Sequence, residues 1–118
     1  MKVYISGMIT SLREDQYRKA FKEAAKYLEE QGHEPVDPSI LGKPEQRSWH
    51  YYMKKAIPQL LECDAIYMLR NWSSSKGAKL ERHIALELDM PCFTQTEEEI
   101  KSLDMDTGGY GKQGILHG

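Results

Sequence analysis

The sequence predicts a single α/β domain in three layers, with a mainly parallel sheet of four to five strands and helices on both faces. Short runs of β-branched and aromatic residues alternate along the chain with segments whose apolar residues recur at helical spacing. One run, 63–69, is apolar except for Asp64, which is typical of a strand buried on both faces. A chain of 118 residues has the length of one domain and can bury a substantial core.

The first strand and the first helix are predicted within residues 3–32. Residues 3–6 form a short β-branched and aromatic run that ends at Gly7. Ser11 and Glu14 fit the S-x-x-E capping box at the start of a helix, which Gly32 closes. The apolar face of this helix is expected to contain Tyr17, Ala20, Phe21, Ala24, Ala25 and Leu28.

The middle of the chain predicts a second strand, a loop and a second helix. Residues 33–36 form a brief strand, and the prolines and glycine within 38–47 predict a loop. Pro58 removes one internal hydrogen bond from the second helix, so we expect a kink or a break near Lys54. The apolar stripe of this helix is the strongest in the chain and contains Trp49, Tyr52, Met53, Ala56, Ile57, Leu60 and Leu61.

The last part of the chain predicts one more helix and strand and then a tail. The elements are a third helix from the serines 73–75 to about Leu88, a fourth strand at 91–94 and a short acidic helix at 97–103. The domain therefore covers 1–103. The Gly-rich tail 104–118 can bury little apolar surface by itself.

The alternation of strands and helices predicts a flavodoxin-like or Rossmann-like topology. In such open parallel sheets, ligands bind beyond the carboxyl ends of the strands, where the strand order reverses. With the strand order 2-1-3-4, that point lies between the first and third strands. We therefore expect the loops 7–11 and 71–77 to face each other across a ligand-binding crevice.

Charge and composition exclude several classes of protein. Lys plus Arg total 16 against 18 Asp plus Glu, a net charge of -2, so no basic surface for a nucleic-acid polymer is expected. No apolar run approaches the roughly 20 residues that span a bilayer, and we expect a cytoplasmic protein without a membrane partner. Cys63 and Cys92 are expected to be reduced thiols, and the four histidines lack metal-ligand spacing, so no metal is expected.

The stretch SSSKG at 73–77 has two possible interpretations. Serine hydroxyls and free N–H groups at a helix start suit a phosphate, but an ordinary serine N-cap also explains them. The order GxxxxGK[ST] is absent, and Gly7 is not part of GxGxxG. The sequence therefore predicts neither a P-loop nor a dinucleotide site, and no cofactor.

Glu81 is the residue of the third helix that needs explaining. Helical spacing places it on the face that carries Gly77, Ala78, Ile84, Ala85 and Leu88. A carboxylate there could act as a nucleophile or base next to a bound anion, could form an ion pair with Lys79 or Arg82, or could be partly solvated at the edge of the sheet. Trp49, Tyr51 and Tyr52 could stack on a nucleobase, although core packing is the simpler interpretation of the first and third.

Four motifs in order resemble the nucleoside 2-deoxyribosyltransferase superfamily, and most closely a small, functionally unassigned branch of it that is frequent in phage and prophage genomes. The motifs are KVYISGMIT, GHEPVDP, YYMKKAIPQLLECDAIYMLRNW and SSSKGAKLERHIALELDMP, which together cover most of residues 2–91. The resemblance implies cleavage of the N-glycosidic bond of a deoxynucleoside or its 5′-monophosphate. It also implies a homodimer or larger homo-oligomer in which neighbouring chains complete each pocket.

The resemblance assigns expected roles to individual residues. Glu81 falls on the glutamate of an S-x-G-x-x-x-E pattern, where it would form a glycosyl-enzyme intermediate, and Tyr4 would orient the sugar or this glutamate. Ser75 and the N–H groups around Gly77 would hold the 5′-phosphate. The residues expected to bind substrate are Gly7, Ser75, Lys76, Gly77, Trp49 and Tyr52.

One departure from the superfamily's pattern leaves other functions open. Ala56 stands where the resemblance implies an aspartate that helps to protonate the leaving base, and a methyl group cannot do so. Asp37, His50 and Tyr52 could replace it by residue type. The protein could instead be a nucleotide-binding or sensing module that has lost the reaction, or an interaction protein whose tail docks on a partner.

Overall fold

The computed structural model describes residues 1–41 and 48–96 and contains a four-stranded, all-parallel sheet. The strands are β1 (Lys2–Ser6), β2 (Glu34–Val36), β3 (Ala65–Met68) and β4 (Cys92–Thr94), in the spatial order β2-β1-β3-β4. The helices are α1 (Glu14–Glu30), α2 (Trp49–Leu61) and α3 (Lys76–Glu87), with 3-10 turns η1 (Pro38–Leu41) and η2 (Trp72–Ser74). The predicted fold class and strand order are confirmed, whereas the predicted helix 97–103 and the tail 104–118 lie outside the described residues.

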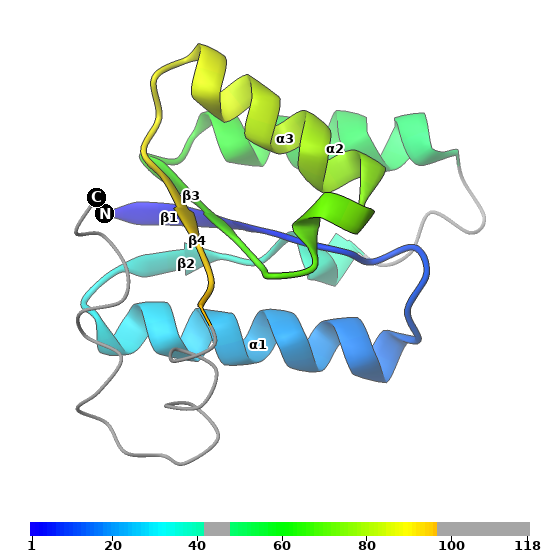
Figure 1. Cartoon of the computed structure of the whole chain (residues 1–118), viewed down its shortest axis with the longest axis horizontal. Coiled ribbons are helices and arrows are strands. Elements are labelled where there is room, and N and C mark those ends of the chain that lie inside the picture. Colours follow the sequence, from blue (N-terminus) through cyan, green and yellow to red (C-terminus); the bar gives the residue numbers. More distant parts are fainter. Residues whose placement is uncertain (42–47, 97–118) are drawn as a thin grey trace.

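The helices cover the two faces of the sheet, α1 on one side and α2 with α3 on the other (Figure 1). Side chains alternate across a strand, so the sheet divides the core into two clusters. Val3 and Ile5 pack with α1 residues such as Phe21, while Tyr4 and Ile66 pack with residues of α2 and α3. β1 lies between β2 and β3 in the sheet. Its alternating side chains reach both layers.

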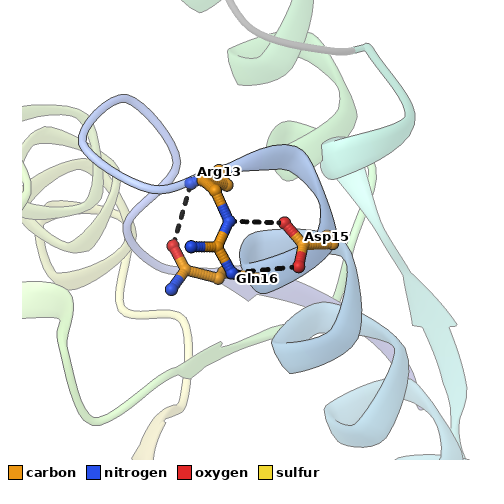
Figure 2. Close-up of polar contacts among 3 residues, drawn as sticks. All are labelled: Arg13, Asp15 and Gln16. Atoms are coloured by element: carbon orange, nitrogen blue, oxygen red, sulfur yellow. Dashed lines mark hydrogen bonds and ion pairs between the residues drawn. The ribbon is translucent and has the colours of Figure 1, made fainter.

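The start of α1 differs from the predicted capping box. The helix begins at Glu14, and the backbone N–H of Arg13 donates to the Gln16 side chain at 3.0 Å, as Figure 2 shows. The Arg13 guanidinium pairs with Asp15, at 3.0 Å between Nε and Oδ1. Ser11 is not the cap because a turn closed by the Leu12 N–H and the Ile9 carbonyl precedes the helix and contains it. The predicted stop is confirmed, since α1 ends just before Gly32, which has a φ of 87°.

A kink or a break was predicted near Lys54, and the break does not occur, because α2 is continuous across Pro58. Pro58 lacks an N–H, which leaves the Lys54 carbonyl without its usual helical partner. Both residues are exposed, and water can therefore solvate that carbonyl without loss of the helix. The helix begins where the Ser48 side chain accepts a hydrogen bond from the Tyr51 N–H at 3.1 Å.

The close packing of β1 against the end of β3 requires glycine at position 7. The N–H of Leu69 donates to the Ser6 carbonyl at 2.8 Å, which draws the two chain segments together just beyond the strands. A Cβ on Gly7 would lie 2.5 Å from Cδ1 and 2.9 Å from Cβ of Leu69. Leu69 Cβ is fixed to the backbone, so this clash could be relieved only by moving the main chain.

We therefore expect Gly7→Ala to lower the free energy of unfolding by about 1–3 kcal/mol, the usual range for overpacking a filled site. Urea unfolding followed by circular dichroism measures this change. Gly77→Ala is the matched control, because its Cβ would lie 3.1 Å from Sδ of Met53, which the unbranched methionine side chain can relieve by a small shift, and the helix would gain propensity. Equal destabilisation by both variants would contradict this account of Gly7.

Candidate active site

A cavity of about 380 Å³ opens at the carboxyl ends of the strands, between the loops that follow β1 and β3. It is lined by Ile5, Gly7, Met8, Ile9, Thr10, Ser11, Phe21, Pro38, Trp49, Tyr52, Met53, Ser74, Ser75, Lys76, Gly77, Ala78 and Glu81. The N–H of Met8 donates to Oδ1 of Asn71 at 3.1 Å and so joins the two loops. The predicted meeting of loops 7–11 and 71–77 at the switch in strand order is confirmed.

Glu81 lies on the buried face of α3 with Ala78 and Ala85, and it is only 5% exposed. Its Oε2 accepts a hydrogen bond from the Tyr4 hydroxyl at 2.5 Å, and its Oε1 accepts one from the Ser6 hydroxyl at 2.7 Å. The strand repeat of two residues places both hydroxyls on the same face of β1. Both carboxyl oxygens are therefore held by the central strand, while the side chain forms part of the cavity wall.

Burial raises the pKa of Glu81 from 4.5 to about 7, although the hydrogen bonds from Tyr4 and Ser6 act in the opposite direction. Burial, together with the nearby charge of Glu81, also raises the pKa of Tyr4 well above its ordinary value. In the described part of the chain, Glu81 forms no ion pair with Lys79 or Arg82, which was the alternative interpretation. The Arg82 guanidinium instead lies 4.6 Å from the centre of the Trp72 ring.

The predicted membership of the apolar face of α3 was partly wrong. Leu88 was expected on the apolar face, but it follows the last residue of the helix and is 56% exposed. The helix ends one residue earlier than predicted, and Asp89 then takes a positive φ of 58° as the chain turns toward β4.

The residues at the start of α3 line the cavity and also have structural roles. Ser75 is the N-cap, and its Oγ accepts from the Ala78 N–H at 3.1 Å, so the ordinary cap interpretation holds. Its hydroxyl hydrogen is not used in that bond. A Cβ on Gly77 would meet Met53 Sδ at 3.1 Å and Trp49 Nε1 at 3.5 Å, so glycine lets α2 approach α3 closely. The Lys76 ammonium lies 4.1 Å from the centre of the Trp49 ring.

Trp49 and Tyr52 form part of the cavity wall on the α2 side. Both are half-buried, and Tyr52 also packs against the core cluster that contains Phe21 and Ile5. Tyr51 is 42% exposed and lies outside the lining, as expected for a residue off the apolar stripe. Of the three aromatic residues predicted to stack on a nucleobase, Trp49 and Tyr52 can touch a ligand in this cavity, whereas Tyr51 cannot.

The structure distinguishes the candidates for a second acid or base group by whether they line the cavity. Ala56 is fully buried and does not line the cavity, and neither do Asp37 and His50. Tyr52 does. Among the described residues that line the cavity, Glu81 is the one acidic side chain.

Sequence reasoning missed Ser6, Asn71 and Met53. Ser6 could have been found from the strand repeat, because it lies two residues after Tyr4 and so shares its face. Asn71 lay within a predicted crevice loop but gave no sign of its hydrogen bond to the opposite loop. Met53 resembled an ordinary core residue of α2.

The fold and the cavity together define an α/β protein with a buried carboxylic acid at the reversal point of a parallel sheet. The chain belongs to the family described as Domain of unknown function (DUF4406), whose model matches residues 1–94. This span includes every residue that lines the cavity. No curated protein matches the chain.

Two further properties of residues 1–41 and 48–96 concern ligands and membranes. These residues contain no group of three or more His, Cys, Asp or Glu arranged to hold a metal ion. None of their helices combines the length and apolar character needed to cross a bilayer. Cys63 and Cys92 are both free thiols.

The raised pKa of Glu81 predicts a specific dependence of stability on pH. The folded protein binds this proton more tightly than the unfolded chain, so the stabilisation is complete below about pH 4.5 and is lost as pH rises through about 7. Ionisation of Glu81 should then cost about 3 kcal/mol, at roughly 1.4 kcal/mol per pKa unit. Glu81→Gln should remove this loss and should be more stable than the wild type at pH 8.

Urea unfolding at pH 5 and pH 8 tests this, with Glu87→Gln as the control because Glu87 is an exposed glutamate on the same helix. The control should keep the wild-type dependence on pH between these two values. If wild type and Glu81→Gln lose the same stability over this range, Glu81 does not titrate as the buried carboxyl requires.

Proposed function

We propose that this protein cleaves the N-glycosidic bond of deoxynucleosides or deoxynucleoside 5′-monophosphates, as a hydrolase or as a deoxyribosyltransferase, with Glu81 as the nucleophile. The observation that carries the proposal is the Glu81 carboxyl group, buried, held at both oxygens and placed on the wall of the cavity. A carboxyl group at such a site has lost the solvation of water without gaining a cation. A cationic transition state next to it would supply the missing charge.

The reaction follows retaining glycoside chemistry. An oxygen of Glu81 forms a bond to the anomeric carbon C1′ while the bond from C1′ to the base nitrogen breaks, and the electron pair leaves with the base. The base takes up a proton. Water, or a second base in the transfer reaction, then attacks C1′ and releases the Glu81 carboxylate. The reaction needs Glu81 ionised, so its rate should rise with pH through about 7.

Tyr4 and Ser6 position the nucleophile. Tyr4 is fully buried and does not line the cavity, so it acts through Glu81 and not on the sugar. Its hydroxyl and that of Ser6 hold the carboxyl group in one orientation relative to β1. Fixing the nucleophile before the substrate arrives lowers the entropic part of the barrier.

The start of α3 suits the 5′-phosphate of a nucleotide. Lys76 adds a positive charge, the Ser75 hydroxyl can donate, and the N–H groups of Lys76 and Gly77 belong to the first turn, where helices leave donors free. Gly7 lines the cavity from the opposite loop. Trp49 and Tyr52 are the aromatic side chains of α2 in the cavity wall that can contact the base.

Incubation with the four deoxynucleoside 5′-monophosphates, followed by chromatography of the free base, tests the proposal. The wild type should release base, and Glu81→Gln should lower the rate by about 1,000-fold or more, as losses of nucleophiles do. Mass spectrometry of the quenched wild-type reaction should find a deoxyribosyl group on Glu81. Glu87→Gln is again the matched control. Full activity of Glu81→Gln would overturn the assignment.

A second candidate function is a nucleotide-binding or sensing module. The observation that favours it is the absence of a second acidic residue among the described residues of the cavity wall, with Ala56 buried behind it. Without acid assistance, base release would be slower by about 100- to 10,000-fold. Calorimetric binding of a deoxynucleoside monophosphate without any base release would select this candidate.

We also propose that the protein forms a homodimer or a larger homo-oligomer. Ile40 on η1 is 68% exposed and its neighbour Leu41 is 38% exposed, so this 3-10 turn has apolar surface to bury. Sedimentation velocity should show an assembly for the wild type and a shift toward monomer for Ile40→Asp. A monomeric wild type would contradict the proposal.

A further inference from the structure

We propose that the Tyr52 phenol donates the proton to the leaving base and recovers it in the second step. This inference rests on the proposed glycosidic function and adds a residue to it. It names the group on the cavity wall that would protonate the leaving base in place of an acidic side chain.

The need for such a group follows from the composition of the cavity wall. A base that leaves with the bonding electron pair is an anion and departs slowly unless it is protonated. Glu81 is the one acidic residue among the described lining residues, and it is occupied as the nucleophile. The proton must therefore come from another side chain or from water.

Tyr52 is the titratable side chain of α2 that lines the cavity with Glu81. It lies four residues before Ala56, so the two share one face of the helix, with Tyr52 one turn nearer the cavity. Its hydroxyl donates to the Pro38 carbonyl at 3.4 Å, which is long for a hydrogen bond from a hydroxyl group. A base nitrogen or oxygen placed in the cavity could replace this weak acceptor.

The other two side chains considered from the sequence do not meet the requirement. Asp37 lies outside the lining, and its Oδ1 already accepts from the N–H of Ser39 at 2.8 Å and from its hydroxyl at 2.5 Å. His50 is exposed, lies with its edge toward the Trp49 ring at 5.4 Å between centroids and does not line the cavity. The remaining phenol near Glu81, that of Tyr4, is fully buried and already donates to the carboxyl group.

Charge in the cavity couples Tyr52 to the state of Glu81. Burial, followed by the charges of Glu81, Asp37 and Tyr17, raises the pKa of Tyr52, so the resting phenol keeps its proton across the working pH range. When Glu81 forms an ester with C1′, its negative charge disappears. One of the causes that raise the pKa of Tyr52 is then removed in the step in which the proton leaves, while burial remains.

The two steps balance as follows. In the first, Glu81 bonds to C1′, the bond from C1′ to the base breaks, and the Tyr52 proton moves to the base, which leaves a phenolate and a neutral ester. In the second, the phenolate removes a proton from water, the resulting oxygen nucleophile bonds to C1′, and the carboxylate of Glu81 is released. Over both steps, one nucleotide and one water are consumed, one free base and one deoxyribose 5-phosphate with a hydroxyl at C1′ are formed, and both side chains are restored. One residue thus acts first as acid and then as base, as in other retaining glycosidases.

The test compares two substrates that differ in their need for a proton. Tyr52→Phe and the wild type are assayed on a deoxynucleoside 5′-monophosphate and on 4-nitrophenyl 2-deoxyriboside 5-phosphate. The 4-nitrophenolate of the second substrate leaves C1′ without protonation. Phenylalanine keeps the ring for packing and stacking. We expect about a 100-fold loss in base release or more, and less than about a 3-fold loss in the first-turnover burst of nitrophenolate. Tyr51→Phe, an exposed tyrosine outside the cavity, is the matched control and should match the wild type on both substrates.

The outcomes separate the two proposals. A similar loss on both substrates would show that Tyr52 only places the ligand, and an unchanged rate of base release would show that its hydroxyl is not used. Either result overturns the role of Tyr52 while the activity, if abolished by Glu81→Gln, stands. If the wild type cleaves neither substrate, the glycosidic function fails and the role of Tyr52 fails with it.

Discussion

One buried interaction fixes how α3 and its acid meet the sheet: the pair of hydrogen bonds that Tyr4 and Ser6 donate to Glu81. A carboxyl group in the interior is costly unless its oxygens have partners. Both partners here come from the central strand, so the bonds tie α3 to the sheet as well as satisfying the acid. A shift of α3 by one residue would turn Glu81 away from both hydroxyls, because neighbouring helical residues point about 100° apart.

Two glycines line the cavity beside this interaction. Gly7 allows β1 to pack on Leu69 at the end of β3, and Gly77 lies against Met53 and Trp49 of α2. Glu81 lies at the wall of an open space and not within a filled core. An acid kept there with a raised pKa weakens the fold at neutral pH, and such an arrangement is more readily explained by chemistry than by stability.

Much of this could be read from local patterns in the sequence. The alternation of strand-like and helical segments indicated the α/β class, and the nearly continuous apolar run 63–69 indicated a strand buried on both faces, which is β3. The helical repeat placed Glu81 on an apolar face, and Gly32 marked the end of α1. Parallel strand order then indicated that the loops after β1 and β3 meet. These features were accessible because each depends on residues that lie within a few positions of one another, or on general rules of chain connection.

Only the tertiary structure decided which side chains meet. Ser6 and Glu81 are 75 residues apart, and their hydrogen bond depends on how α3 settles on the sheet. The choice of Arg13 over Ser11 as the α1 cap depends on a turn that the S-x-x-E pattern did not reveal. Tyr52 lines the cavity and Asp37 does not, and this difference depends on how α2 packs against the rest of the fold. Periodicity places a residue on a face of its own element, whereas contacts across the cavity depend on how separate elements pack against one another.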